Sequence, residues 1–329
     1  MKKLVEVRNL RAYYILRGGK IAVKAVDNIT MDIKEGEVLG IVGESGCGKS
    51  TFARCIMMDF TPPLRKIGGK IIMNGHDLTN LSMEELRKNV WGRLVSMIPQ
   101  SALNALPPVR KIGDFIYDVA SYRLGIRDKE KVQELAQERF EDVKLAPYVL
   151  NMYPHELSGG MKQRVAIAIA TLLKPKLLIA DEPTSALDVV TQKAILRTLL
   201  DLKKGGIIGS IMFITHDIAI LRQIADRIGV MYAGKLVEIG SVDQILYNPL
   251  HPYTKALINS VVTPEPEIRK RGIAYIPGNP PELINPPPGC RFHPRCPYVK
   301  GICKIREPEM ITVEPGHLVA CHLYSQEEG

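Results

Sequence analysis

Residues 43–50, which read GESGCGKS, have the residue types and the spacing of a loop that binds phosphate groups. A predicted strand at 37–42 precedes them and a helical run follows, which is the context that such a loop requires. Backbone N–H groups of a glycine-rich turn point inward at phosphates, and the following helix adds the positive end of its dipole. We therefore expect Lys49 to reach the β- and γ-phosphates of a nucleotide and the Ser50 hydroxyl to bind Mg²⁺. Cys47 is interpreted as a small residue that fills the loop, not as a reactive thiol. The residues of this stretch expected to contact the nucleotide are Gly43, Ser45, Gly46, Cys47, Gly48, Lys49, Ser50 and Thr51.

A second apolar run, residues 177–180, ends in two carboxylates, Asp181 and Glu182. A buried strand that ends in acids places them at the carboxyl edge of its sheet, where α/β proteins bind their ligands. Asp181 is expected to hold Mg²⁺, directly or through water, and Glu182 to act as general base on the attacking water. The alternative is that the two acids cap the next element before Pro183. The phosphate-binding loop favours the catalytic interpretation.

Residues 157–163, LSGGMKQ, resemble the signature motif of ATP-binding cassette (ABC) proteins over its Leu-Ser-Gly-Gly core. The other motifs of that family follow in the family's order. Gln100 resembles the glutamine of the Q-loop, residues 185–188 the D-loop, and His216 the switch histidine. The resemblance implies that Gln100 takes part in Mg²⁺ binding and catalysis, and that His216 contacts the γ-phosphate and positions water.

Two further features of the site are implied by the same resemblance. Tyr14 is similar to the aromatic residue that stacks on adenine, with Tyr13 as a close rival. The signature turn of the family precedes a helix that faces the γ-phosphate bound by another protomer, so Ser158 and Gly160 are expected to complete a partner's site. The cofactors implied are ATP and Mg²⁺. Two cassettes, identical or near relatives, would close head to tail over two ATP molecules.

The elements that must position these residues alternate, in the first half of the chain, between apolar runs and helical stretches. Such runs fit a sheet covered on both faces. Tight turns are predicted at Asn74-Gly75 and, within a hairpin at 228–239, at Ala233-Gly234. Residues 128–143 are predicted to form an amphipathic helix. The fold class is α/β: a P-loop NTPase cassette with an antiparallel β subdomain, a helical subdomain at about 101–160 and an irregular Pro- and Cys-rich C-terminal appendage.

Composition and charge exclude several classes of protein. The 329 residues are 46% apolar and 24% charged, as in ordinary globular proteins. The apolar stretch at 165–173 is too short to cross a bilayer. Glu6 and Arg8 stand where a signal peptide would have its apolar region, so we do not expect export. The net charge of +9 is spread along the chain without a basic run, so we expect no nucleic-acid partner. Together with the resemblance, this places the protein peripherally at the cytoplasmic face of the cell membrane.

From about residue 248 the composition changes, because prolines become frequent. So much proline forbids long helices and central strands. Residues 248–257, NPLHPYTKAL, resemble the tail of the oligopeptide and dipeptide importer branch of the ABC family, and the resemblance extends through 277–281 and 289–292. By itself, His251-Pro252 also fits an ordinary helix start. We interpret residues 1–247 as the ATPase domain and 248–329 as a C-terminal domain. Because this domain is remote in sequence from the phosphate-binding loop, we expect its cysteines to be structural and not catalytic, and ATP binding at Lys49 to survive the change of Cys296 to Ser.

Four cysteines crowd into that tail, separated by five, six and seventeen residues: Cys290, Cys296, Cys303 and Cys321. Their spacing is neither the paired spacing of common zinc sites nor that of ferredoxins. Disulfides are disfavoured in a cytosolic ATPase. The importer branch contains members whose tail cysteines bind an iron–sulfur cluster, so the resemblance implies a [4Fe-4S] cluster, with zinc as the alternative.

The function implied is ATP hydrolysis that powers import of dipeptides or oligopeptides through two separate permease subunits, supplied by an extracytoplasmic substrate-binding protein. Nickel or sugar remains an alternative cargo, since the ATPase does not touch the solute. A DNA-associated ABC ATPase would insert a long coiled coil before the signature, where only about fifty residues and no sustained heptad occur. A translation-associated cassette protein usually has two P-loops, whereas this chain has one.

Overall fold

The structure, a computed structural model, describes residues 2–100, 106–124, 126–185, 187–260, 276 and 278–325. Residues 101–105 of the predicted helical subdomain, Ala186 of the D-loop and Pro277 of the tail lie outside this description. The chain forms two compact units. Unit 1 comprises residues 1–4, 34–36 and 73–212, and unit 2 comprises residues 5–33, 37–72 and 213–329.

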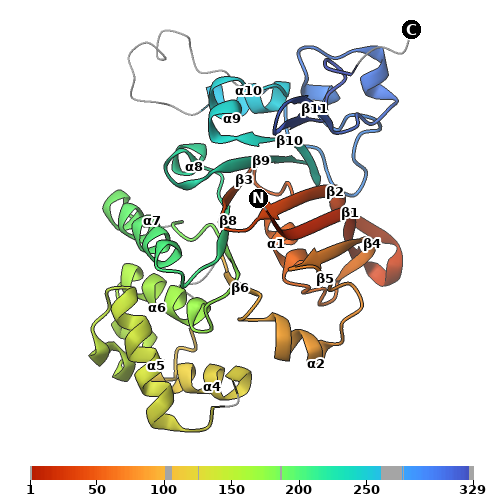
Figure 1. Cartoon of the computed structure of the whole chain (residues 1–329). Coiled ribbons are helices and arrows are strands. Elements are labelled where there is room, and N and C mark those ends of the chain that lie inside the picture. The colour runs from red at the N-terminus through yellow and green to blue at the C-terminus, as the bar shows by residue number, and fades with distance from the viewer. Residues whose placement is uncertain are drawn as a thin grey trace. The chain divides into compact units, whose positions relative to one another are not determined.

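Unit 2 contains most of the strands (Figure 1). They are β1 (Lys3–Leu16), β2 (Ile21–Lys34), β3 (Val38–Val42), β4 (Leu64–Met73), β9 (Arg227–Tyr232), β10 (Lys235–Ser241), β11 (Ile311–Glu314) and β12 (His317–Val319). Its helices are α1 (Lys49–Ile56), α8 (Ile218–Ile224), α9 (Val242–Tyr247) and α10 (Pro252–Asn259), with the 3-10 turns η1 (Arg17–Gly19), η5 (His293–Arg295) and η6 (Gly301–Lys304).

The strands of unit 2 belong to two sheets. In one, the neighbours run in the order β2-β1-β4, and in the other β11-β12-β10-β9-β3. β3 pairs in parallel with β9, with Leu39 opposite Arg227. β9 and β10 form the antiparallel hairpin predicted from the sequence, and its turn residues Ala233 and Gly234 have φ angles of 47° and 81°. All five residues of β3 are buried, which fits a strand covered on both faces.

The C-terminal tail is mostly irregular, as predicted, but two short strands and one buried acid tie it to the sheet. β12 pairs with β10, placing Val319 opposite Glu238. The fully buried Glu238 carboxylate accepts hydrogen bonds from the backbone N–H groups of Leu250 (2.8 Å) and His251 (2.9 Å) and from His317 Nε2 (2.8 Å). The partners that satisfy this buried charge are therefore all supplied by the segment that follows β10.

Unit 1 carries the long helices, which Figure 1 shows in yellow and green. Its elements are β5 (His76–Asp77), α2 (Met83–Glu85), η2 (Leu86–Val90), β6 (Val95–Ile98), α4 (Ile112–Leu124), α5 (Lys129–Asp142), η3 (Pro147–Asn151), η4 (Pro154–Glu156), α6 (Gly159–Thr171), β7 (Leu177–Asp181) and α7 (Val189–Lys204). The strand β8 (Ser210–Ile214) begins in unit 1, which ends at Met212.

Local sequence explains why the main elements of unit 1 form where they do. α5 covers the predicted amphipathic helix, and Asp128 caps it by accepting hydrogen bonds from the N–H groups of Glu130 and Lys131. α5 packs against α4 and α6, so the predicted helical region is present. β7 is buried throughout and pairs in parallel with β6, which brings the carboxyl ends of both strands to one edge.

Candidate nucleotide-binding site

The phosphate-binding loop leaves the carboxyl end of β3, and α1 begins at Lys49. Two of its glycines are required by close backbone contacts. A Cβ on Gly48, which has φ of 106°, would lie 2.0 Å from the carbonyl oxygen of Ala25, and a Cβ on Gly43 would lie 2.1 Å from that of Met231. A Cβ on Gly46 would meet open space. The loop is therefore pressed against neighbouring backbone at its two ends, with room at its middle.

Lys49 is buried within this loop, with 6% of its surface exposed. Its ammonium donates hydrogen bonds to the carbonyl oxygens of Gly43 (2.7 Å) and Glu44 (3.0 Å). Burial raises the pKa of the neighbouring Cys47 thiol, which fits the interpretation of Cys47 as an unreactive filler. A charged ammonium held by loop carbonyls, beside a helix N-terminus, is an arrangement that suits a polyphosphate.

The two rival tyrosines of β1 have different neighbours. The Tyr14 hydroxyl lies 3.1 Å from the Thr51 hydroxyl in α1, beside the loop. The Tyr13 hydroxyl donates a hydrogen bond to Asp27 at 2.7 Å. Burial and that hydrogen bond raise the pKa of Tyr13 to about 12. Tyr14 is thus the tyrosine next to the phosphate-binding helix, and its stacking on adenine stays a prediction.

In unit 1 the structure brings together two residues expected in catalysis. Gln100 follows β6 and Glu182 follows β7, and Gln100 Nε2 donates a hydrogen bond to Glu182 Oε2 at 3.4 Å. Asp181, the last residue of β7, is 1% exposed, whereas Glu182 has a φ of 47°, uncommon for a residue with a side chain. His216, which follows β8, is exposed and belongs to unit 2, as do Lys49 and Ser50.

The signature motif forms the start of α6. Ser158 is the N-cap, and its hydroxyl accepts a hydrogen bond from the N–H of Met161 at 3.3 Å. A Cβ on Gly160 would lie 2.9 Å from Cγ2 of Thr191, so a side chain there would press on α7. Ser158 is exposed at the positive end of the helix dipole, a position that attracts anions. In the D-loop, Asp188 caps α7 and hydrogen bonds from Thr191 lower its pKa.

Sequence reasoning missed three residues at the loop. Glu44 receives two hydrogen bonds from Arg295, and its backbone N–H donates to the hydroxyl of Tyr253 at 2.8 Å. The tail is remote from the loop in sequence and yet contacts it in the structure. Sequence reasoning missed these contacts because Tyr253 and Arg295 lie 209 and 251 positions from Glu44, so no local pattern links them. The one hint in the sequence is the stretch 248–257, because its tyrosine, Tyr253, is the residue that contacts Glu44.

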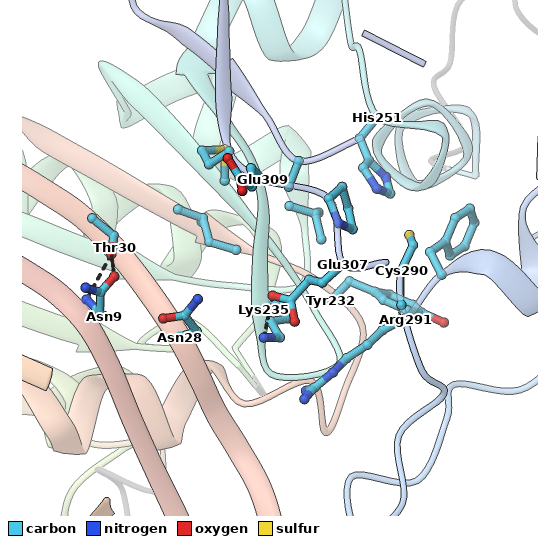
Figure 2. Close-up of a pocket in the computed structure, with 17 residues that line it drawn as sticks. Asn9, Asn28, Thr30, Tyr232, Lys235, His251, Cys290, Arg291, Glu307 and Glu309 are labelled. Carbon is cyan, nitrogen blue, oxygen red and sulfur yellow. Dashed lines mark hydrogen bonds and ion pairs between the residues drawn. The ribbon is translucent and has the colours of Figure 1, made fainter. Parts of the chain in front are cut away.

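A cavity of about 480 Å³ in unit 2 lies beside the tail (Figure 2). Lys235 and Glu307 form an ion pair of 2.6 Å on its wall. Arg291, also on the wall, pairs with Asp27 and donates a hydrogen bond to the carbonyl oxygen of Ala233. The tail is thereby fixed by charged contacts to β2 and to the β9–β10 turn.

The four tail cysteines share one neighbourhood. The N–H of Cys290 donates to the carbonyl oxygen of Cys303 at 2.9 Å. Burial, with smaller effects of the nearby thiols Cys296 and Cys303, raises the pKa of Cys290 to about 12 and of Cys321 to about 11. Within the described ranges, however, no three or more His, Cys, Asp or Glu side chains are arranged to hold a metal ion. The expectation of a [4Fe-4S] cluster or zinc site thus gains no support from this arrangement.

The fold and the loop define a P-loop ATPase of the cassette type. The sequence matches the family described as ABC transporter over residues 26–185, and that described as oligopeptide/dipeptide transporter, C-terminal region, over residues 237–303. The chain belongs to the ABC transporter family, as the motifs predicted, and is an ATPase of it. No helix in the described part of the chain is both long and apolar enough for a membrane crossing.

Individual relatives match over nearly the full length. The chain is 46% identical over 328 residues to the dipeptide transport ATP-binding protein DppD of Caldanaerobacter subterraneus subsp. tengcongensis, covering 99% of this chain and 98% of that protein. It is 42% identical over 334 residues to the oligopeptide transport ATP-binding protein AppF of Bacillus subtilis, covering 98% of each. A solved dimeric structure of a post-hydrolysis state of an ATP-binding cassette, bound to ADP and Pi, matches with a TM-score of 0.63 and 29% identity, covering 72% of this chain and 98% of that one.

Proposed function

We propose that this ATPase powers the import of dipeptides or oligopeptides through a separate transmembrane permease, from a peripheral position at the cytoplasmic face of the membrane. The observation that carries the proposal is that relatives named as dipeptide and oligopeptide transport proteins match at least 98% of the chain, including the C-terminal region. Residues 1–247 would form the ATPase domain and 248–329 the importer-type C-terminal domain. Nickel or sugar import is the alternative that the same motor would serve.

The chemistry proposed for the site uses this chain's own groups. Lys49 and the loop around it bind the β- and γ-phosphates, supported by the buried ammonium and the cradle between Gly43 and Gly48. Glu182 accepts the proton of the attacking water, and its contact with Gln100 supports a shared role.

Three further residues, together with Gln100, complete the proposed site. Mg²⁺, when bound, neutralises phosphate charge, and its proposed ligands are Ser50, Gln100 and Asp181. His216 contacts the γ-phosphate.

The site is proposed to need a second cassette, identical or related. Ser158 and Gly160, at the start of α6, face the nucleotide of that partner in a head-to-tail dimer. Support comes from the exposed, capped helix N-terminus and from the similarity to a cassette solved as a dimer. Two permease subunits and an extracytoplasmic substrate-binding protein are the other proposed partners, and no nucleic acid is among them.

The cysteine cluster remains part of the proposal. The four thiols share one neighbourhood, with a backbone contact between Cys290 and Cys303, and the centre proposed there is a [4Fe-4S] cluster, with zinc as the alternative. Anaerobic purification, an absorption spectrum and iron, sulfide and zinc analysis test this. A metal-free tail after anaerobic purification would refute it.

The cargo is tested by assembling the chain with its partner cassette, permease pair and binding protein in vesicles. ATP hydrolysis should rise when a dipeptide or oligopeptide is added outside, and nickel or sugars should leave it unchanged. A Glu182→Gln chain in the same assembly is the control for ATP turnover by this subunit. Stimulation by nickel or a sugar alone would contradict peptide import while leaving the ATPase assignment intact.

A further inference from the structure

Two residues of the C-terminal tail hold Glu44, the second residue of the phosphate-binding loop. Arg295 Nη1 donates a hydrogen bond to Glu44 Oε2 at 2.8 Å, and Arg295 Nη2 donates to Oε1 at 3.0 Å. The Tyr253 hydroxyl accepts a hydrogen bond from the backbone N–H of Glu44 at 2.8 Å. The side chain and the main chain of one loop residue are therefore both fixed by the tail.

The surroundings of these contacts make them strong. The side chain of Arg295 is 6% exposed and that of Glu44 is 22% exposed, so solvent and salt screen their two-pronged ion pair little. Arg295 also donates to the Tyr232 hydroxyl at 3.3 Å. Tyr253 is fully buried, with its ring centroid 4.6 Å from that of Tyr232. Contacts with Tyr232 therefore hold both Arg295 and Tyr253 in place.

Glu44 connects these tail contacts directly to the phosphate-binding lysine. The carbonyl oxygen of Glu44 accepts a hydrogen bond from Lys49 Nζ at 3.0 Å. The same carbonyl accepts one from the N–H of Cys47 at 3.2 Å. A shift of the Glu44 backbone would therefore move the group that orients the ammonium and the turn that carries the loop's N–H donors.

A second contact of the tail reaches the other end of the loop. Arg291, labelled in Figure 2, donates a hydrogen bond to the carbonyl oxygen of Ala233 in the β9–β10 turn. The next residue of that turn, Gly234, donates its N–H to the carbonyl oxygen of Cys47 at 2.8 Å. The loop is thus held at Glu44 by Arg295, the last residue of η5, and at Cys47 through the turn that Arg291 contacts.

We propose that Arg295 and Tyr253 are positioning residues of the nucleotide site, and that the C-terminal tail sets the affinity of the loop for ATP. This inference rests on the proposed role of residues 43–50 in binding phosphate. A purely structural role would lower thermal stability in a tail variant without changing the ATP affinity of the folded protein. The two roles are therefore separable by measuring both quantities on the same variants.

The experiment measures the Kd for ATP with Mg²⁺, and the melting temperature, on the full-length chain. Arg295→Ala, Glu44→Ala and the double variant form a cycle. Arg306→Ala is the matched control, because Arg306 belongs to the same tail but its side chain is 64% exposed. Tyr253→Phe removes a single hydroxyl and keeps the packed ring, so it serves if Arg295→Ala fails to fold.

We expect Arg295→Ala to weaken ATP binding by about tenfold, which corresponds to about 1.4 kcal/mol. Glu44→Ala should have a similar effect, and the double variant should be no weaker than either single one, because both remove the same contact. Tyr253→Phe should weaken binding and Arg306→Ala should not.

Wild-type affinity in folded Arg295→Ala or in Tyr253→Phe would overturn the proposal, as would additive effects in the cycle. Wild-type affinity in Lys49→Ala would instead refute the proposed role of the loop itself.

Discussion

The amide of Gln100 donates a hydrogen bond of 3.4 Å to the carboxylate of Glu182. The two residues follow neighbouring parallel strands, β6 and β7, whose carboxyl ends share one edge. The contact couples the proposed general base to Gln100, which is a proposed ligand of Mg²⁺. It also gives a way to change the basicity of Glu182 without altering Glu182 itself.

The first prediction uses that contact. Gln100→Glu places a second carboxylate beside Glu182, and two neighbouring carboxylates raise one of their pKa values. If Glu182 must be ionised to accept a proton, the acid limb of the rate–pH profile should move to higher pH, by about one unit or more. Gln100→Met, uncharged and of similar length, should lower the rate without moving the acid limb. Identical acid limbs in the wild type and Gln100→Glu would exclude Glu182 as the base.

The second prediction concerns the division of labour between two cassettes. Ser158→Arg places a bulky cation at the exposed start of α6, so ATP-dependent dimer formation should fail while the isolated chain still binds ATP with nearly unchanged affinity. Ser158→Ala is the control for the lost cap, which costs about 1 kcal/mol of stability. Sedimentation with and without ATP and a Kd on the monomer are the measurements. A large loss of monomer affinity would mean that Ser158 contacts the nucleotide of its own chain.

The third prediction is a pH dependence of stability that originates in the tail. Burial, with a smaller effect of Lys255, lowers the pKa of His251 to about 3, and its Nδ1 accepts a hydrogen bond from the N–H of Tyr253. In the unfolded chain the pKa is about 6.5, so below that pH the unfolded state binds the extra proton. The free energy of unfolding should therefore fall, by up to about 1.4 kcal/mol per pH unit, as the pH drops from 6.5 toward 4.

His251→Asn tests this dependence, because asparagine also caps helices but does not titrate. Denaturant unfolding at pH 7, 6, 5 and 4 should show a shallower decline for this variant than for the wild type. His76→Asn, at an exposed position, is the control and should keep the wild-type slope. Equal slopes for His251→Asn and the wild type would show that His251 is not the titrating group.

The fourth prediction revises an expectation drawn from the sequence. The distance of the tail from the loop in sequence predicts that ATP binding survives Cys296→Ser. The contact of Arg295 with Glu44 favours the opposite outcome, because Cys296 directly follows Arg295. If the cysteines bind a cluster, Cys296→Ser and Cys321→Ser should both lose iron and both weaken ATP binding. Iron retained in both variants would contradict the cluster, and iron loss with wild-type ATP affinity would contradict the coupling.

Local patterns predicted the parts of the site that are local. The loop at Gly43, the strand that ends at Asp181 and the turn at Ala233-Gly234 each carry their information within a few residues, through glycine conformations or buried apolar runs. The structure places them as the sequence indicates.

Contacts between distant segments could not be predicted in the same way. Arg295 and Tyr253 look like ordinary residues of a proline-rich tail, and Glu44 lies between Gly43 and Gly48, the two glycines that close backbone contacts require. Their contact depends on β12 pairing with β10 and on the buried Glu238, which together return the tail to the sheet. No single-sequence pattern reports a strand of three residues or an ion pair across 251 positions.

The most direct test of the central claim, ATP hydrolysis with Glu182 as the base, is a comparison of ATP binding and turnover in Glu182→Gln and Lys49→Ala. Glutamine keeps the size of the side chain but accepts no proton, so Glu182→Gln should bind ATP with wild-type affinity, accumulate the ATP-bound dimer and lose at least about 100-fold in hydrolysis rate. Lys49→Ala should instead lose ATP binding. Wild-type turnover in Glu182→Gln would contradict the account.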